Sequence, residues 1–214
     1  MVDFLIALPG INIASSIFSR NEILSSVLVL GDRQGLTYAR GVLFESAGLY
    51  GKSDLRILDR NTAFVEKKAK MEAQFFAEGM TYYKDNLVQI TWKKQQGFVY
   101  DILSLEEIDR FNFETTVNQG WGITWDRCND ELIVTDGSTN LHFWDPNTFK
   151  EIRRVKVTRN DGSDAKEMNE IEFWRGRVLA NVWHEDVILV INPETGVVEK
   201  EYGELKKIEG PRLG

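Results

Sequence analysis

The sequence is poor in cysteine, histidine and proline, which limits the chemistry and the stabilising devices open to it. A single cysteine, Cys128, among 214 residues excludes an internal disulfide, and two histidines without a cysteine cluster leave no zinc-binding set. No apolar run approaches the roughly 18 to 20 residues of a membrane span. Excess positive charge is also missing. A net charge of −7 and a pI near 5.0 argue against nucleic acid as a partner.

What the sequence does contain is a repeat, because four segments begin in a similar way. They are Gln34-Gly35-Leu36-Thr37-Tyr38, Glu78-Gly79-Met80-Thr81-Tyr82, Trp121-Gly122-Ile123-Thr124-Trp125 and Asn169-Glu170-Ile171-Glu172-Phe173. Their first residues lie 44, 43 and 48 positions apart, which is the period of a repeat architecture rather than of a helix or a strand. Each unit continues through short β-rich segments separated by turns, a pattern typical of a propeller blade.

Alternating apolar residues and intervening turn residues predict four strands in each unit. In the first unit they are Leu36–Ala39, Val42–Ala47, Leu55–Leu58 and Ala63–Lys68, and in the second Met80–Tyr83, Leu87–Trp92, Phe98–Asp101 and Ile108–Phe113. In the third they are Ile123–Asp126, Glu131–Thr135, Leu141–Trp144 and Glu151–Val157, and in the fourth Ile171–Trp174, Val178–Val182, Val187–Ile191 and Val197–Tyr202.

The two ends of the chain predict a further, incomplete blade. Residues Asn21–Leu30 resemble an outermost strand, but no three inner strands precede them, and the next repeat would begin near position 213. Propellers protect their edges by closing, often with strands from both termini in one blade. We therefore expect an all-β, five-bladed propeller fold, truncated here to four blades and the closing strand of a fifth. It would form one domain over residues 21–214, after an N-terminal extension, residues 1–20, of unassigned role.

The repeat also predicts where a functional site lies, because the first strand of each blade lines the central channel. The residues that head the four units should converge at one mouth, and they are Gln34, Glu78, Trp121 and Asn169. A second ring is expected at the ends of the second strands, formed by Ala47, Trp92, Gly137 and Trp183. One carboxylate, two amides and three indoles would form an apolar cup with a few convergent polar groups.

The remaining candidates for chemistry lack a supporting motif. His142 lies in a predicted strand, and His184 and Cys128 lie in turns, so we assign all three structural or surface roles. The acidic pairs do not follow the spacing of a calcium-binding loop, and we expect them to be solvated. These pairs are Asp161 with Asp164 and Glu167 with Glu170.

Motifs spread over residues 31–202 resemble those of the plant-type glutaminyl-peptide cyclotransferases. They are Gln34-Gly35-Leu36, Phe44-Glu45-Ser46-Ala47-Gly48-Leu49-Tyr50-Gly51, Glu78-Gly79-Met80-Thr81, Ile90-Thr91-Trp92, Gly120-Trp121-Gly122, Thr135-Asp136-Gly137-Ser138, Asn169-Glu170-Ile171-Glu172 and Ala180-Asn181-Val182-Trp183. The resemblance implies a five-bladed propeller that converts N-terminal glutamine to pyroglutamate and releases ammonia, which makes it an acyltransferase.

Under this interpretation the candidate catalytic residues are Glu78, Asn169 and Gln34, and Trp92, Trp121 and Trp183 bind the substrate. The resemblance implies no required cofactor and no metal at the reacting centre, and it is compatible with a structural calcium ion in the channel. The partners would be peptides or proteins with an N-terminal glutamine, bound by a monomer that is secreted or otherwise outside the cytoplasm.

The chain differs from the family pattern at two places. Asp32-Arg33-Gln34 stands where family members usually carry Phe-Thr-Gln, so a carboxylate replaces an aromatic side chain. The family's fifth blade contributes an Asn-Gly-Ile start and a Gly-Lys segment whose lysine belongs to the active site, and this chain ends before that blade.

Two other functions stay open on the sequence. A catalytically inactive propeller could bind a peptide or a small ligand, but binding alone does not require a carboxylate such as Glu78 among the tryptophans. A propeller hydrolase or lactonase would need several metal-binding Asp, Asn and Glu side chains on the channel axis. Trp121 interrupts such a set.

Overall fold

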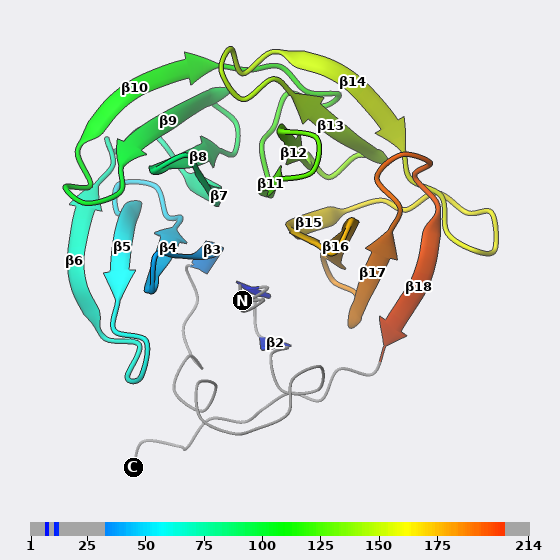
Figure 1. Ribbon diagram of the computed structural model, residues 1–214, viewed down its shortest axis with the longest axis horizontal. Helices are drawn as coiled ribbons and strands as arrows, with labels where there is room; N and C mark the ends of the chain where they lie inside the picture. Colours follow the sequence, from blue (N-terminus) through cyan, green and yellow to red (C-terminus); the bar gives the residue numbers. More distant parts are fainter. Residues whose placement is uncertain (1–6, 9–10, 13–32, 204–214) are drawn as a thin grey trace.

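The computed structural model describes residues 7–8, 11–12 and 33–203, and its regular structure in these ranges is entirely β. Four antiparallel four-stranded sheets follow one another along the chain, and Figure 1 shows them as an arc around a common centre. The first sheet contains β3 (Arg33–Ala39), β4 (Val42–Ala47), β5 (Asp54–Leu58) and β6 (Val65–Lys70). The second contains β7 (Ala77–Tyr83), β8 (Asn86–Thr91), β9 (Gln96–Asp101) and β10 (Glu107–Asn112).

The other two sheets repeat the same order from the centre outwards. The third contains β11 (Ile123–Asp126), β12 (Glu131–Val134), β13 (Asn140–Trp144) and β14 (Glu151–Lys156). The fourth contains β15 (Met168–Trp174), β16 (Arg177–Val182), β17 (Val187–Ile191) and β18 (Val198–Gly203). Each strand predicted for the four repeat units has its counterpart, and the propeller interpretation is confirmed. We refer to the four sheets as blades 1 to 4.

Three inner strands begin earlier than the sequence predicted, and β-bulges explain the difference. The pairing register shifts between Arg33 and Gly35 in β3, between Ala77 and Met80 in β7, and between Met168 and Ile171 in β15. The strand therefore continues through the residue that heads the unit instead of starting after it. A bulge redirects side chains locally and is frequent beside functional sites.

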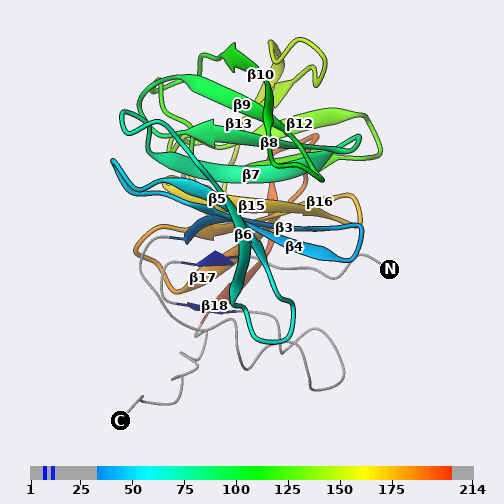
Figure 2. The same ribbon diagram turned by 90° about the vertical axis from the view of Figure 1, so that its left-hand side faces the viewer.

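The outer strands carry charge where the inner ones are buried. The side chains of β6, β10 and β14 are mostly exposed, and these strands have the sequences VEKKAK, EIDRFN and EIRRVK. Charged residues on an edge strand oppose pairing with other chains. Figure 2 shows β6 on the outside of its sheet, facing the viewer.

The hydrophobic core lies in layers between neighbouring blades. Phe44 and Leu55 of blade 1 pack with Met80 and Phe98 of blade 2 in one buried cluster. A second cluster joins blades 2 and 3, and a third joins blades 3 and 4. Face-to-face packing of successive sheets fixes the angle between them and so holds the inner strands around one axis.

Glycines allow the inner strands to approach one another closely. A Cβ atom built on Gly79 would lie 2.6 Å from the carbonyl oxygen of Trp121, and one on Gly122 would lie 2.3 Å from that of Asn169. Real Cβ atoms do not come this close to backbone, so both positions require glycine. The fourth blade has Glu170 at this position in the repeat.

The N-terminal part contributes one short strand pair. Strand β1 (Ala7–Leu8) pairs antiparallel with β2 (Ile11–Asn12), with Leu8 opposite Ile11. The predicted closing strand, Asn21–Leu30, lies outside the described residues. The expected domain boundaries therefore stay a prediction.

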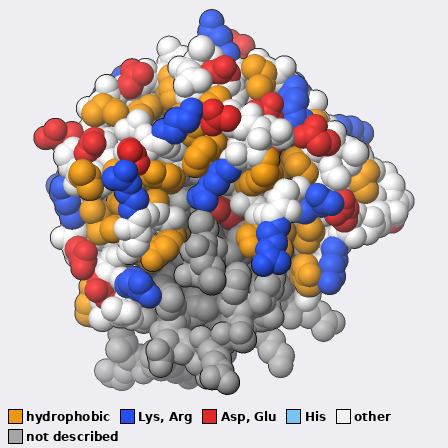
Figure 3. Space-filling model, viewed as in Figure 1, with side chains coloured by type: hydrophobic (Ala, Val, Ile, Leu, Met, Phe, Trp, Pro, Cys, Tyr) orange, Lys and Arg blue, Asp and Glu red, His pale blue; other side chains and the backbone are white. Residues whose placement is uncertain are grey.

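The face of the molecule shown in Figure 3 has no large patch of charge of one sign. In Figure 3 acidic and basic side chains are interspersed over the face shown. Among the described residues, no helix is long and apolar enough to cross a membrane.

Candidate functional site

The residues that head the four units have backbones that lie side by side: Gln34, Glu78 and Asn169 are on inner strands, and Trp121 precedes the inner strand β11. The amide of Gly79, next to Glu78, donates to the carbonyl oxygen of Trp121 at 2.7 Å. Gly122, next to Trp121, packs against the backbone of Asn169. Gly35, next to Gln34, packs in the same way against Gly79. The structure thus brings the backbones of all four head residues together.

Glu78 is the buried carboxyl of this group. Its exposed fraction is 7%, and its side chain makes no hydrogen bond to another described residue. Burial raises the pKa of Glu78 well above its ordinary value, because the ionised form loses the solvation of water. Within the described part of the chain, the Glu78 carboxyl therefore has no hydrogen-bond partner, and its carboxylate is a stronger base than that of an exposed glutamate.

Two tryptophan backbones flank Glu78 along the chain. The amide of Trp92 donates to the carbonyl oxygen of Phe76 at 3.1 Å, two residues before Glu78, and the Trp121 carbonyl accepts from Gly79 immediately after it. The backbone of Glu78 thus lies between two residues that are hydrogen-bonded to the backbones of Trp92 and Trp121.

Buried hydroxyls support the head residues, and the sequence analysis missed them. Ser46 Oγ donates to the Glu78 carbonyl oxygen and accepts from Gln89 Nε2 at 2.7 Å. Thr135 Oγ1 donates to the Asn169 carbonyl oxygen at 2.6 Å. Ser46 and Thr135 occupy equivalent positions in the repeat, so a small hydroxyl recurring there was the available signal.

The strand register corrects one member of the predicted second ring. Ala47 lies opposite Arg33, as Thr91 lies opposite Ala77, so Ala47 corresponds to Thr91 and not to Trp92. The next residue, Gly48, is the true counterpart of Trp92 and Trp183. The sequence-based alignment was wrong by one residue: β3 and β7 carry the same bulge, so Gly48 follows Gln34 by the same number of positions as Trp92 follows Glu78.

Gly48 leaves room for an aromatic ring that the sequence analysis also missed. A Cβ atom on Gly48 would lie 2.6 Å from Cε1 of Phe76. The Phe76 ring meets the Trp92 ring edge-on at 5.7 Å between centroids, and Trp121 meets Trp183 in the same manner at 5.7 Å. We call Phe76, Trp92, Trp121 and Trp183 the aromatic wall. Trp183 is its most exposed member, at 44%.

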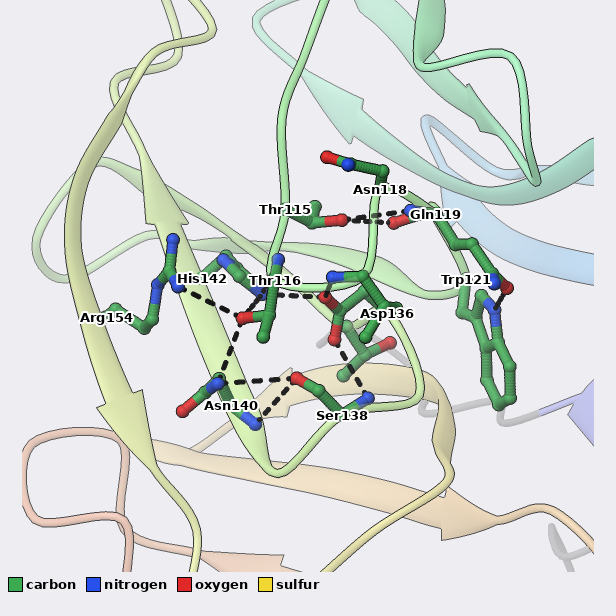
Figure 4. A network of polar contacts seen from close by, with 12 residues as sticks. Thr115, Thr116, Asn118, Gln119, Trp121, Asp136, Ser138, Asn140, His142 and Arg154 are labelled. Carbon is green, nitrogen blue, oxygen red and sulfur yellow. Dashed lines mark hydrogen bonds and ion pairs between the residues drawn. The ribbon is translucent and has the colours of Figure 1, made fainter.

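His142 has the structural role expected of it, within a buried polar network (Figure 4). Its ring is fully buried, with Nδ1 2.9 Å from Glu151 Oε2 and Nε2 3.2 Å from Asp136 Oδ2. Burial alone would raise the pKa of Asp136, but hydrogen bonds from His142 and Ser138 lower it to about 2. With a carboxylate oxygen at each nitrogen, the imidazole is not free to activate a nucleophile.

The other minor candidates follow the expectations with one exception. Cys128 and His184 are exposed, as are Asp161, Asp164 and Glu167. Glu170 is 4% exposed, so the prediction that it is solvated was wrong. Burial raises the pKa of Glu170 well above its ordinary value, and the charges of Glu172 and Glu78 add to the effect. The Glu170 backbone lies on an inner strand, which the alternation pattern did not reveal.

Metal binding stays a prediction for this chain. Within residues 33–203 and the two short N-terminal strands, no three His, Cys, Asp or Glu side chains are grouped to hold a metal ion. Asp32, the residue that differs from the family pattern, lies outside the described residues. Its neighbour Arg33 pairs with Glu45, Nε to Oε1 at 2.6 Å, in blade 1.

Glu172 on β15 provides a test of the electrostatics near the channel. Burial raises its pKa to about 8, although the charge of Arg127 lowers it, against about 4.3 for an unfolded chain. The folded state therefore binds this proton more tightly, and stability is lost as the pH rises from about 4.3 to 8.

We expect the melting temperature to fall over this range, and Glu172→Gln to make the fall shallower. The exposed Glu66→Gln serves as control. An unchanged slope in Glu172→Gln would contradict the assignment.

Sequence comparison finds relatives over most of the chain. A family model described as glutamine cyclotransferase matches residues 33–210. A glutaminyl-peptide cyclotransferase of Arabidopsis thaliana is 38% identical over 164 residues, which are 76% of this chain and 50% of the Arabidopsis protein. The chain therefore spans about half the length of that curated relative.

Solved structures share the fold. The crystal structure of Myxococcus xanthus glutaminyl cyclase matches with a TM-score of 0.71 at 29% identity, covering 79% of this chain and 69% of that one. Kuenenia stuttgartiensis hydrazine synthase matches with a TM-score of 0.55 at 15% identity, covering 85% and 52%. The second similarity concerns the propeller fold alone.

Proposed function

Because the chain belongs to the glutamine cyclotransferase family, we propose that its site converts the N-terminal glutamine of a peptide to pyroglutamate. The α-nitrogen forms a bond to the side-chain carbonyl carbon, the bond from that carbon to the amide nitrogen breaks, and ammonia leaves. The observation that carries the proposal is Glu78, a buried carboxyl without a hydrogen bond to another described residue, whose neighbours in the chain are hydrogen-bonded to the backbones of Trp92 and Trp121.

Glu78 moves the proton that this reaction requires. The α-amine of a peptide has a pKa near 7.7 to 8.0, so a neutral fraction exists at physiological pH. Burial raises the pKa of Glu78 well above its ordinary value, so its carboxylate is a better acceptor for the amine proton, which the carboxyl then returns to the departing nitrogen. General acid–base catalysis of this kind contributes about 10²- to 10⁴-fold.

Asn169 and Gln34 provide hydrogen-bond donors. Both side chains are half-buried, and neither makes a hydrogen bond to another described residue. Their amides are available to polarise the γ-carbonyl or to hold the first peptide carbonyl. A well-placed donor to a developing oxyanion contributes about 3 kcal/mol.

The aromatic wall holds the aliphatic part of the glutamine. Trp92, Trp121 and Trp183 would bury this stem and exclude water that would otherwise hydrolyse the amide. They would also favour the bent conformer in which the amine approaches its own carbonyl, an orientation effect that lowers the barrier.

A binding function without turnover is the second candidate, and the family pattern supplies the reason to keep it. The family's active-site lysine belongs to a fifth blade, and residues 33–203 contain four. Under this second candidate, four blades would bind a peptide or a small ligand without turning it over, whereas the first candidate predicts slow turnover by the same four blades.

A peptide assay separates the two functions. The chain is incubated with a peptide that begins with glutamine, or with the same peptide beginning with asparagine, and ammonia release is followed with tryptophan fluorescence as the binding signal. We expect saturable binding and slow ammonia release for the glutamine peptide alone. Binding without release would favour the second function, and the absence of both would contradict the proposal.

A further inference from the structure

We propose that Gln119 is a positioning residue that fixes two members of the aromatic wall through a single oxygen atom. Its Oε1 accepts a hydrogen bond from Trp92 Nε1 at 2.6 Å and another from Trp121 Nε1 at 3.0 Å. Trp92 follows β8 in blade 2, and Trp121 precedes β11 in blade 3. Figure 4 shows the Gln119 side chain reaching toward the Trp121 indole.

The chemistry of the two groups makes this arrangement specific. An indole nitrogen can only donate, and an amide oxygen has two acceptor sites, so one glutamine oxygen satisfies both tryptophans. The reversed amide would set its NH₂ group against two N–H donors, and the network therefore fixes its orientation. A half-buried indole N–H without a partner would lose a hydrogen bond, so each ring is held in the rotamer that reaches Gln119.

Hydrogen bonds fix the backbone of Gln119 and so fix the position from which its side chain extends. Thr115 Oγ1 accepts from the Gln119 amide at 3.0 Å and donates to the Gln119 carbonyl oxygen at 2.7 Å. The amide of the next residue, Gly120, donates to the Trp92 carbonyl oxygen at 2.9 Å. The segment of residues 115–119 is also held at Val117, whose amide donates to Asp136 Oδ2 at 3.0 Å.

Asp136 links this connection to the buried histidine. It accepts from Val117 on one side and lies against His142 on the other, and His142 in turn contacts Glu151 on the outermost strand of blade 3. The polar network of Figure 4 thus gives residues 115–119 a rigid support. Asp136 and His142 are therefore structural residues, because they hold the segment that carries Gln119.

The position of Gln119 joins the two halves of the aromatic wall. Trp92 packs on Phe76 and Trp121 packs on Trp183, and no described ring contact crosses between these pairs. Gln119 therefore sets the spacing between them. This last step rests on the proposed function: the spacing between the two ring pairs would define the width of the binding site for the aliphatic part of the glutamine. Gln119 then influences substrate binding more than the chemical step.

The indole resonances test the first part of the proposal directly. The chain has six tryptophans, so ¹⁵N-tryptophan labelling gives six side-chain N–H signals. Trp92→Phe and Trp121→Phe assign two of them. We expect Gln119→Met, which keeps the length and removes the acceptor, to shift these two signals and speed their exchange with solvent. Gln119→Glu retains an acceptor oxygen and should restore both.

Gln96→Met is the matched control, because Gln96 is also half-buried and its side chain reaches Asn112 on the neighbouring strand and no indole. It should leave the six signals in place. Unchanged Trp92 and Trp121 signals in a folded Gln119→Met protein would overturn the proposal. Equal shifts in Gln96→Met would overturn it as well, since the effect would then be general loosening.

Binding of a glutamine-headed peptide tests the second part. We expect Gln119→Met to weaken binding roughly 10-fold, to raise KM by a similar factor with kcat changed less than about twofold, and Gln119→Glu to reverse these effects. Shifted indoles with unchanged binding would overturn the link to the substrate. If the unmodified chain binds no such peptide, the proposed function fails, and the indole signals still decide the role of Gln119.

Discussion

Replacing Glu78 by glutamine lowers the turnover of a glutamine-headed peptide by at least about 10²-fold and leaves the fold intact, the loss expected when general acid–base catalysis is removed. The substitution keeps the shape of the side chain and removes its ability to take up and return a proton. No ion pair or hydrogen bond to the described residues is lost with it, because the Glu78 carboxyl has none, so the melting temperature should not fall.

The pH profile of the same variant gives a second readout. The wild-type rate should depend on ionisation of a carboxyl whose pKa burial has raised, and Glu78→Gln should lose that dependence while keeping the one that belongs to the substrate amine. Glu172→Gln is the control, since it also removes a carboxyl of raised pKa from an inner strand. An unchanged turnover number in Glu78→Gln would exclude Glu78 from the mechanism.

Local pattern was sufficient to predict the strands and their grouping. Turns such as Arg40-Gly41 separate runs of alternating apolar residues, and the structure places Val42–Ala47 as a strand with the predicted bounds. The period of the units then identified the residues that meet at the channel. Gly35, Gly79 and Gly122 allow neighbouring inner strands to approach closely, because a Cβ atom at any of them would lie too near the backbone of the next segment.

The features that the sequence could not supply depend on contacts between blades. The bulges of β3, β7 and β15 are not encoded in apolar alternation, and they make these strands begin earlier than the sequence predicted. Burial of Glu170 and the double acceptor role of Gln119 arise from neighbours distant in sequence. Gln119 directly precedes Gly120-Trp121 in the sequence, yet nothing local indicates that Trp92 shares its oxygen.

Adding a fifth blade of the family pattern should produce the largest gain in both stability and turnover. Blade 1 packs one face on blade 2, and its other face carries a separate small cluster of Leu36, Leu43 and Leu58. Among the described elements, strand β1 contacts β3 of blade 1, and blades 1 and 4 stand apart in Figure 1. A fifth sheet seated between blades 1 and 4 would add face-to-face packing, and each Å² of apolar surface that it removes from water would contribute about 25 cal/mol.

The same blade would supply the lysine that the family pattern places in the active site, a positive charge beside the developing oxyanion. We expect residues 1–214 alone to melt broadly and to release ammonia slowly, and the extended form to melt cooperatively and to turn over faster. Replacing the added lysine by methionine should keep the sharp melting and lose most of the gain in rate, which separates the structural contribution of the blade from its chemical one. If the 214-residue form melts as sharply and reacts as fast as the extended form, four blades are sufficient and the incomplete-propeller interpretation fails.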